Sequence, residues 1–447
     1  MRDIDSAIQH LKTKPLPNSL IKLLTTIRRN GGTGFLVGGW VRDSLMGIPN
    51  YDYDIEVFDI EESLLKNILA PQGHIELVGE SFGIFKVHLR DNDLERYTID
   101  VSLPRTERKV SVGHKGFITN ADPKMHVSEA CRRRDITINS MLYDPLGGAF
   151  GEGDLWDCYG GLQDLKQRVI RVVDPETFVE DSLRVLRAMQ FAARFNFTID
   201  QATVELCKSI DLIDLPAERL WGEIEKWFLS KYPSVGAKYF VELGIYKLFK
   251  SIDPLLYLGD FGEDTLIAIC KDIGKAMDFF LTCEGRPSHN GYKQALFLCF
   301  LSNLFYTGAD FEKFLDMLKV YTIDGYDVRK KVMQIVMNPS IPRTDSEIRR
   351  ESVKKDLQLF FDFKICENVV LDNRGLTTSL VMSEYRAKEL KCCSNSLQPL
   401  LSGKHVIELG VPEGKKVGEI CKAVFEIQLD GEIETVEEAI MSAREYL

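Results

Sequence analysis

Residues 34–43 read Gly34-Phe35-Leu36-Val37-Gly38-Gly39-Trp40-Val41-Arg42-Asp43, and residues 52–56 read Asp52-Tyr53-Asp54-Ile55-Glu56. The apolar run that ends at Val37 predicts a buried strand, and the Gly38-Gly39 pair predicts a tight turn into a helix. Because glycine has no Cβ atom, such a turn lets backbone N–H groups approach a phosphate chain, and the helix N-terminus that follows favours an anion. This order of strand, turn and helix predicts a mixed α/β domain.

Asp52 and Asp54 stand two residues apart on the next predicted strand, so their side chains are expected on one face. Two neighbouring carboxylates are the hard oxygen ligands that Mg²⁺ prefers. In two-metal chemistry, one ion activates an attacking hydroxyl and the other neutralises a triphosphate and the departing pyrophosphate. Asp100, on the predicted strand 97–101, is a candidate third carboxylate, and an ordinary surface acid is the alternative interpretation.

The composition is typical of a globular protein, with 447 residues, 45% hydrophobic residues and a formal net charge of -11. At about 100–200 residues per domain, this length predicts several domains. The longest apolar run, Ala295 to Leu301, is far shorter than the roughly 20 residues that span a bilayer, so no membrane segment is expected. Met1 to Asp5 carries acids where a secretory signal would be basic. We therefore expect a cytoplasmic protein.

The ten cysteines include no Cys-x-x-Cys pair, which predicts reduced and mostly buried thiols. Short β-type runs are expected up to about Asp144, at 35–37, 53–58, 84–89 and 97–101, and helical periodicity is expected over Glu176 to Phe197 and in most of the remaining chain. We predict three parts, namely a head at 1–150, a helical neck at 151–255, and a helical body and tail at 256–447.

A second constellation reads Arg132-Arg133-Arg134-Asp135-Ile136-Thr137-Ile138-Asn139. Consecutive arginines are usually a solvated face. However, guanidinium groups also fit triphosphate oxygens, and a nearby Asp and Asn could hold ribose hydroxyls.

A third constellation, Glu180-Asp181-Ser182-Leu183-Arg184-Val185-Leu186-Arg187, lies within the predicted helix. Asp181 and Arg184 are three residues apart, so an ordinary helical ion pair is one interpretation. In the functional interpretation, Asp181 accepts a hydrogen bond from an exocyclic amino group and Arg184 donates to the adjacent ring nitrogen. Cytosine and adenine share this pattern, whereas uracil and guanine would place donor against donor.

Five ordered blocks of the chain resemble the class II (bacterial-type) CCA-adding tRNA nucleotidyltransferase and poly(A) polymerase family. The resemblance is strong from about Gly34 to Lys226. The blocks are Gly38-Gly39-x-Val41-Arg42-Asp43 with Asp52-x-Asp54, Arg133-Arg134-Asp135-x-Thr137-Ile138-Asn139, Asp157-x-Tyr159-x-Gly161-x-x-Asp164-Leu165, Glu180-Asp181-x-Leu183-Arg184 with Arg187 and Phe191-Ala192-Ala193-Arg194, and Pro216-Ala217-Glu218-Arg219 with Glu223. The fold implied is α+β, with a nucleotidyltransferase-superfamily head that contains a mixed sheet, followed by an all-helical neck, body and tail.

The resemblance also implies functional roles. The metal ligands would be Asp52 and Asp54, assisted in catalysis by Asp100, and Asp181 and Arg184 would select CTP and then ATP without a nucleic-acid template. The remaining nucleotide-binding residues implied are Gly38, Gly39, Arg42, Arg133, Arg134, Asp135, Asn139 and Arg187. The implied reaction adds CMP, CMP and AMP to the 3′ end of tRNA with Mg²⁺, and the partners are the tRNA acceptor arm, CTP and ATP. Basic residues between Arg329 and Lys355 are candidate phosphate contacts, and a solvated surface is the alternative.

Other functions remain open. An A-adding tRNA nucleotidyltransferase or a poly(A) polymerase would share every catalytic residue, although the acidic C-terminus disfavours the latter. The segment from Arg105 to Glu129 resembles the flexible element of full CCA-adding enzymes, which disfavours a CC-only enzyme. A noncatalytic RNA-binding relative is disfavoured because both the acidic pair, Asp52 and Asp54, and the base-reading pair, Asp181 and Arg184, are intact. A phosphohydrolase is disfavoured because Lys271 replaces the metal-binding His that some relatives carry.

Overall fold

The computed structural model describes residues 4–72, 75–78, 84–91, 96–109, 117–147, 155–213, 215–248, 262–305 and 307–447. The chain divides into two compact units. The first unit comprises Met1–Trp227 and Glu242–Leu248, and the second comprises Phe228–Val241 and Phe249–Leu447. The three-part division into head, neck, and body with tail stays a prediction.

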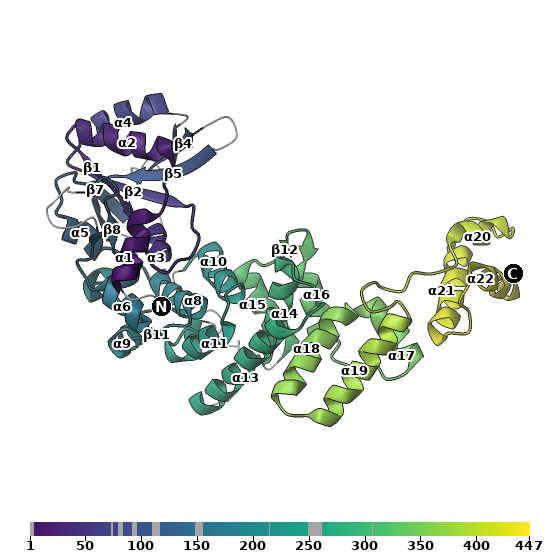
Figure 1. Cartoon of the computed structure of the whole chain (residues 1–447). Coiled ribbons are helices and arrows are strands. Elements are labelled where there is room, and N and C mark those ends of the chain that lie inside the picture. The colour runs from purple at the N-terminus through teal and green to yellow at the C-terminus, as the bar shows by residue number, and fades with distance from the viewer. Residues whose placement is uncertain are drawn as a thin grey trace. The chain divides into compact units, whose positions relative to one another are not determined.

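A mixed sheet of seven strands forms the centre of the first unit, in the order β3-β4-β5-β2-β1-β8-β9 (Figure 1). β2 and β5 run parallel, and every other neighbouring pair in this sheet is antiparallel. This arrangement confirms the expected mixed sheet. The strands are β1 (Thr33–Val37), β2 (Tyr53–Phe58), β3 (Ile75–Val78), β4 (Ile84–Arg90), β5 (Arg96–Ser102), β8 (Leu142–Tyr143) and β9 (Leu155–Trp156).

The predicted strand–turn–helix unit is confirmed. β1 is an apolar strand whose Phe35 and Leu36 are fully buried. Helix α2 (Asn18–Arg29) packs on β1, and a Cβ atom at Gly34 would lie only 2.6 Å from Leu24 of α2. The chain leaves β1 through Gly38, which has a φ of 66°, and enters α3 (Gly39–Leu45). A side chain is costly at this backbone angle, which explains the glycine.

The remaining helices of the first unit lie before, between and after the strands of this sheet in the chain. They are α1 (Ile4–Thr13), α4 (Glu62–Leu69), α5 (Val127–Arg132), α6 (Gly161–Gln167), α7 (Pro175–Phe178), α8 (Leu183–Phe195), α9 (Gln201–Ser209) and α10 (Ala217–Phe228), with short 3₁₀ helices at Ala70–Gln72 and Thr137–Asn139 and a small parallel pair of β10 (Val169–Ile170) and β11 (Thr198–Ile199).

The continuous helix expected over Glu176 to Phe197 is wrong. The structure has α7 and α8 instead, with residues 179–182 in a turn between them. Asp181 lies in this turn, where one of its carboxylate oxygens accepts a hydrogen bond from the Leu183 N–H at 3.2 Å. An Asp side chain that bonds the backbone nearby competes with helix formation, which explains the interruption.

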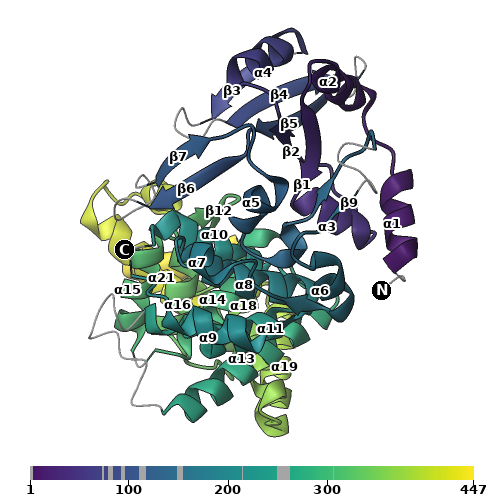
Figure 2. The same cartoon turned by 90° about the vertical axis from the view of Figure 1, so that its left-hand side faces the viewer.

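The segment from Arg105 to Glu129 contains an antiparallel ribbon of β6 (Arg105–Lys109) and β7 (Phe117–Ala121), which is visible in Figure 2. Residues 110–116 lie outside the described residues. The flexibility expected of this segment stays a prediction.

The second unit is built around α14 (Asn290–Ser302). This helix contains the longest apolar run of the chain, and Ala295 to Leu301 are buried because α13, α16 and α18 contact α14. The elements of this unit are α11 (Pro233–Glu242), α13 (Glu263–Thr282), α14, α15 (Gly308–Leu318), β12 (Thr322–Ile323), β13 (Tyr326–Asp327), α16 (Val328–Met337), α17 (Asp345–Lys354), α18 (Leu357–Val370), α19 (Arg374–Glu389), α20 (Gly403–Glu408), α21 (Lys415–Asp430), α22 (Val436–Ala443) and a 3₁₀ helix at Arg444–Tyr446.

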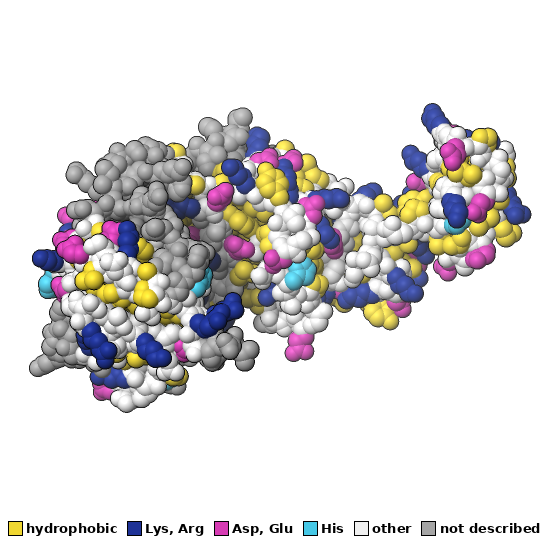
Figure 3. All heavy atoms as spheres, turned by 90° about the horizontal axis from the view of Figure 1, so that it is seen from above, with side chains coloured by type: hydrophobic (Ala, Val, Ile, Leu, Met, Phe, Trp, Pro, Cys, Tyr) yellow, Lys and Arg dark blue, Asp and Glu magenta, His cyan; other side chains and the backbone are white. Residues whose placement is uncertain are grey.

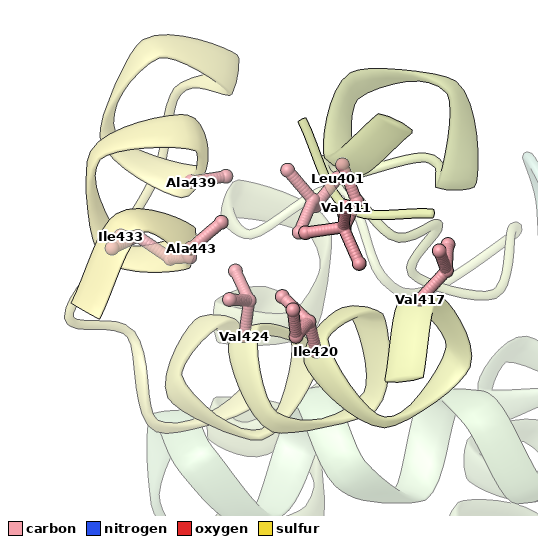
Figure 4. Packing of buried hydrophobic residues seen from close by; sticks show 9 residues of the cluster. Leu401, Val411, Val417, Ile420, Val424, Ile433, Ala439 and Ala443 are labelled. Carbon is pink, nitrogen blue, oxygen red and sulfur yellow. The ribbon is translucent and has the colours of Figure 1, made fainter. Parts of the chain in front are cut away.

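The C-terminal helices α20, α21 and α22 share a small hydrophobic core of their own (Figure 4). Leu401 and Val411 meet Ile420 and Val424 of α21, and Ala439 of α22 completes the packing. Helices α20 and α22 begin at well-formed caps, since Ser402 and Thr435 each form a reciprocal capping box with the residue three positions later.

The expectation of reduced, mostly buried thiols is confirmed. All ten cysteines are free and most are buried. Among the helices of the described residues, none combines the length and the apolar character needed to cross a membrane.

Candidate functional site

An open cavity of about 360 Å³ lies in the first unit, at the turn between β1 and α3. It brings together most of the residues that the sequence predicts to act on a nucleotide. The cavity is lined by Gly38, Gly39, Arg42, Asp43, Asn50, Asp52, Asp54, Arg134, Asp135, Asn139, Arg187, Gln190, Phe191, Arg194 and Lys226.

The Gly38 turn is in close contact with two of these side chains. A Cβ atom on Gly38 would lie 3.2 Å from the Nη1 atom of Arg134 and 3.8 Å from the Oδ2 atom of Asp54. The absence of a side chain at Gly38 therefore leaves room beside the turn for the Arg134 guanidinium and the Asp54 carboxylate. The structure therefore gives a reason for glycine at position 38 in addition to the phosphate approach expected from the sequence.

Replacing Gly38 with Ala is expected to destabilise the protein by about 1–3 kcal/mol, because an Ala would be strained at this positive φ and would displace Arg134. Thermal unfolding measures this loss. Gly222→Ala is the matched control, since a Cβ atom on this residue of α10 meets no atom within 4 Å. Equal melting temperatures for the two variants would contradict the requirement at Gly38.

Asp54 lies on β2 as the sequence predicts, whereas Asp52, which was expected on the same strand, lies immediately before it. Burial and the Asp52 carboxylate raise the pKa of Asp54 to about 6, although Arg134 acts in the opposite direction. Asp100 lies on β5 beside Asp54 and contributes to the same repulsion, but it is not among the residues that line the cavity. Its carboxylate lies 4.0 Å from the Lys86 ammonium. Within the described ranges, no group of three or more His, Cys, Asp or Glu side chains is arranged to hold a metal.

Two of the consecutive arginines are held by one buried acid. Glu56 is fully buried, and its two oxygens accept hydrogen bonds from Arg133 at 2.6 Å and from Arg134 at 3.2 Å. Burial alone would raise the pKa of Glu56, but the two guanidinium groups lower it below its usual value. Arg134 lines the cavity and Arg133 does not. Glu56 therefore positions Arg134, while Arg133 offsets the charge of Glu56 from behind.

Asp135 and Asn139 belong to a connected polar network. Asp135 accepts hydrogen bonds from Asn139 at 3.1 Å and from Arg187 at 2.7 Å, and Asn139 accepts one from Arg42 at 2.5 Å. Burial would raise the pKa of Asp135, but Arg187 and Asn139 lower it. Asp43 is the second acid of the network and accepts a hydrogen bond from Arg42 at 2.8 Å. These bonds hold the side chains in place along the cavity wall.

Asp181 and Arg184 do not line this cavity and do not pair with each other in the described structure. The Oδ2 atom of Asp181 accepts a hydrogen bond from Arg219 at 2.8 Å. Arg184 donates to the backbone carbonyl of Thr177 at 2.7 Å and to that of Arg133 at 2.6 Å. The interpretation of Asp181 and Arg184 as an ordinary helical ion pair is therefore wrong, because both side chains form hydrogen bonds with other partners.

Sequence reasoning missed several residues of the cavity wall, namely Asp43, Asn50, Gln190, Phe191, Arg194 and Lys226. A signal for two of them is present in the sequence, because Phe191 and Arg194 follow the predicted Arg187 at intervals of four and three residues along α8 and therefore share its helix face. Asn50 and Lys226 come from separate elements and carry no such signal.

The basic residues expected as phosphate contacts are mostly engaged within the second unit. Arg329 pairs with Glu312 and Asp316, and Lys331 pairs with Asp356. Arg350 pairs with Glu426 and Asp430, Lys354 with Glu351, and Lys355 is buried. On the face shown in Figure 3, Lys and Arg side chains are correspondingly interspersed with Asp and Glu. These pairs favour the solvated-surface interpretation.

Lys271 lies on α13, and the neighbouring Asp272 pairs with Lys275 at 2.9 Å. The expected lack of phosphohydrolase activity stays a prediction.

Two family models match the chain. Residues 34–171 match the poly A polymerase head domain, and residues 196–256 match the probable RNA and SrmB-binding site of polymerase A. The CCA-adding enzyme of Blochmanniella pennsylvanica (strain BPEN) is 32% identical over 328 residues, which cover 66% of this chain and 76% of that protein. The multifunctional CCA protein of Pasteurella multocida (strain Pm70) is 35% identical over 300 residues, which cover 58% of this chain and 66% of that protein.

This chain spans only 50% of another such relative, the multifunctional CCA protein of Haemophilus influenzae (strain PittGG). The fold matches the crystal structure of the Bacillus stearothermophilus CCA-adding enzyme in complex with CTP, with a TM-score of 0.66, 20% identity, and coverage of 97% of this chain and 98% of that one. It also matches the Thermotoga maritima CCA-adding enzyme complexed with tRNA, with a TM-score of 0.60, 20% identity, and coverage of 99% and 98%. The chain belongs to the class II CCA-adding tRNA nucleotidyltransferase and poly(A) polymerase family.

Proposed function

We propose that this protein is a template-independent CCA-adding tRNA nucleotidyltransferase, which adds CMP, CMP and AMP to the 3′ end of tRNA from CTP and ATP and releases pyrophosphate. One observation carries the proposal, namely that a single cavity gathers the Asp52 and Asp54 carboxylates with Arg42, Arg134 and Arg187. Carboxylates for metal ions and guanidinium groups for a triphosphate are the two requirements of nucleotidyl transfer.

Asp52 and Asp54 fit a divalent metal, and we propose Mg²⁺. The two carboxylates repel each other strongly enough to contribute to the raised pKa of Asp54, and a cation between them would relieve this repulsion. Mg²⁺ is commonly bound by one or two carboxylates together with substrate phosphates, so a third protein ligand is not required. When bound, the metal lowers the pKa of the attacking hydroxyl and stabilises the charge of the leaving pyrophosphate. Asp100 is proposed as an assisting carboxylate on the adjacent strand.

The chain's own residues would hold the nucleotide. Arg42, Arg134 and Arg187 are proposed to bind the triphosphate, with Arg133 supporting Arg134 from behind. Asp135 and Asn139 are proposed to bind the ribose hydroxyls. The Gly38-Gly39 turn would bring backbone N–H groups to the phosphates.

Base selection is assigned to Asp181 and Arg184, by the hydrogen-bond pattern shared by cytosine and adenine. Since Arg219 and backbone carbonyls hold these side chains in the structure, base reading requires them to exchange partners. The tRNA acceptor arm and 3′ end are the proposed partners, and the helical regions after the sheet would bind them. We further propose a cytoplasmic location, where tRNA, CTP and ATP are found.

The test is incubation of the purified protein with Mg²⁺ and tRNA transcripts that lack the CCA end, that end in CC, or that are complete, supplied with CTP, ATP or both. Three additions to the first transcript followed by a stop are expected. Addition of a single A only to the transcript ending in CC would instead indicate an A-adding enzyme. Unlimited A tails would indicate a poly(A) polymerase, and no addition to any transcript would contradict the proposal.

A further inference from the structure

Arg194 is the least restrained guanidinium of the cavity wall. It lies in the last turn of α8 and its side chain is 44% exposed. Within the described part of the chain, its one hydrogen bond runs from Nη2 to the Oδ2 atom of Asp43 at 3.2 Å, and its guanidinium lies 4.9 Å from the Phe195 ring centre. Most of its donors therefore remain available to a ligand, because a guanidinium has five N–H groups.

The other arginines of the cavity are held more firmly. Arg42 is only 3% exposed and donates to Asp43 and Asn139. Arg187 donates a hydrogen bond from Nε to Asp135 at 2.7 Å, and its Nη2 atom forms an ion pair with the same oxygen, also at 2.7 Å. Arg134 is 18% exposed and donates to Glu56. Such bonds fix the position of a guanidinium and use part of its capacity, so these three residues form a rigid wall.

Asp43 does not neutralise Arg194. This carboxylate is 1% exposed and already accepts two short contacts from Arg42, at 2.8 and 2.7 Å, and one from Asn50 at 2.9 Å. Arg42 and Arg194 therefore share one negative charge between them, and the shorter bonds belong to Arg42. A positive charge remains at Arg194.

The charge balance of the whole site also indicates an excess of positive charge. With Asp52 and Asp54 assigned to the proposed metal, the cations that line the cavity, together with Arg133, outnumber the carboxylates with which they form ion pairs. The cations are Arg42, Arg133, Arg134, Arg187, Arg194 and Lys226, and the carboxylates are Asp43, Glu56, Asp135 and Glu223. An uncompensated positive charge in a cavity attracts an anion.

We propose that Arg194 is a further phosphate-binding residue, which binds the triphosphate of the incoming nucleotide while Asp43 and Phe195 keep its guanidinium directed along the cavity wall. The proposal rests on the function proposed above and adds a ligand that the sequence blocks did not assign. A planar guanidinium forms two parallel, charge-assisted hydrogen bonds to phosphate oxygens, and its single long bond to Asp43 makes rearrangement inexpensive.

The experiment compares wild-type protein with Arg194→Gln and Arg194→Lys. Calorimetry with Ca²⁺ in place of Mg²⁺ measures the dissociation constants of CTP and of cytidine, which has no phosphate. Arg194→Gln is expected to weaken CTP binding about 10- to 100-fold, because a charged hydrogen bond is lost, and to leave cytidine binding unchanged. Arg194→Lys should recover part of the loss. In steady state, the KM for CTP should rise more than kcat falls.

Arg29→Gln is the matched control, because Arg29 also lies in the last turn of a helix in the first unit and is exposed. It should leave both dissociation constants and the melting temperature unchanged. An unchanged CTP affinity in Arg194→Gln, or an equal loss for CTP and cytidine, would overturn the assignment of Arg194. If wild-type protein binds neither CTP nor ATP, the function proposed above fails as well, so the two failures are distinguishable.

Discussion

Replacing Asp54 with Asn is expected to lower nucleotide transfer by at least about 1,000-fold, because the amide cannot hold a divalent metal as the carboxylate does. Asp52→Ala is expected to have a similar effect, since the two carboxylates are proposed to act as one site. Single-turnover incorporation of CMP into a tRNA transcript lacking the CCA end measures the loss. The melting temperature of each variant shows that the fold is retained.

Asp54→Asn is also expected to stabilise the protein in the absence of metal. The pKa of Asp54 rises from 3.8 to about 6 in the folded protein, so the native state binds more protons than the unfolded state between these values. The free energy of unfolding of the wild-type protein therefore falls as the pH rises through this interval. At pH 7 the Asp54 carboxyl is ionised and the destabilisation is complete. Asp54→Asn should therefore raise the free energy of unfolding by on the order of 1–3 kcal/mol at pH 7 and leave it unchanged at pH 3.

A divalent metal should oppose the destabilisation that the ionised Asp54 carboxylate causes in the wild-type protein. Because binding favours the ionised carboxylate, Mg²⁺ should stabilise the wild type more at pH 7 than at pH 5 and should have little effect on Asp54→Asn. Glu205→Gln is the matched control, since Glu205 is an exposed acid on α9 with only local partners. Retained transfer in Asp54→Asn, or equal stabilisation of both proteins by Mg²⁺, would contradict the metal assignment.

The parts of the fold that were predictable from the sequence are those whose pattern is local. The run that ends at Val37, the Gly38-Gly39 turn and the strand that carries Asp54 are confirmed, because burial and glycine conformation act within a few residues. For the apolar run from Ala295 to Leu301, the sequence predicted only that it is too short to cross a membrane. Its burial in α14 depends on three helices that the sequence pattern does not place around it.

What could not be predicted depends on side-chain partners that are distant in the sequence. Asp181 interrupts the expected helix and pairs with Arg219, which lies on α10. Arg350 pairs with Glu426 and Asp430, so a basic stretch that looked available to phosphate is largely neutralised. Charge type and spacing predict which groups a chain carries, but the partner of each charge is decided by tertiary structure.

Replacing Asp181 with Ala is expected to reduce the preference for CTP over UTP by about 100-fold or more while leaving transfer from CTP measurable. A site that hydrogen-bonds a substrate group discriminates strongly against an analogue that lacks it, because a buried polar group is then left unpaired. Without the Asp181 carboxylate, the carbonyl of uracil no longer faces an acceptor, and only the contact between its ring N–H and the Arg184 donor still opposes UTP. The ratio of kcat/KM for CTP to that for UTP, on one tRNA transcript, measures the effect.

Arg219→Ala separates base reading from structural support. It removes the 2.8 Å partner of Asp181 but leaves the Asp181 carboxylate and Arg184 in the protein. If Asp181 reads the base, Arg219→Ala should retain the preference for CTP, and CTP binding should improve or stay unchanged because the carboxylate no longer has to exchange partners. If Asp181 serves only to hold Arg219, both variants should lose transfer equally with every nucleotide. That second outcome would remove Asp181 from base selection and leave it as part of the packing between the turn at 179–182 and α10.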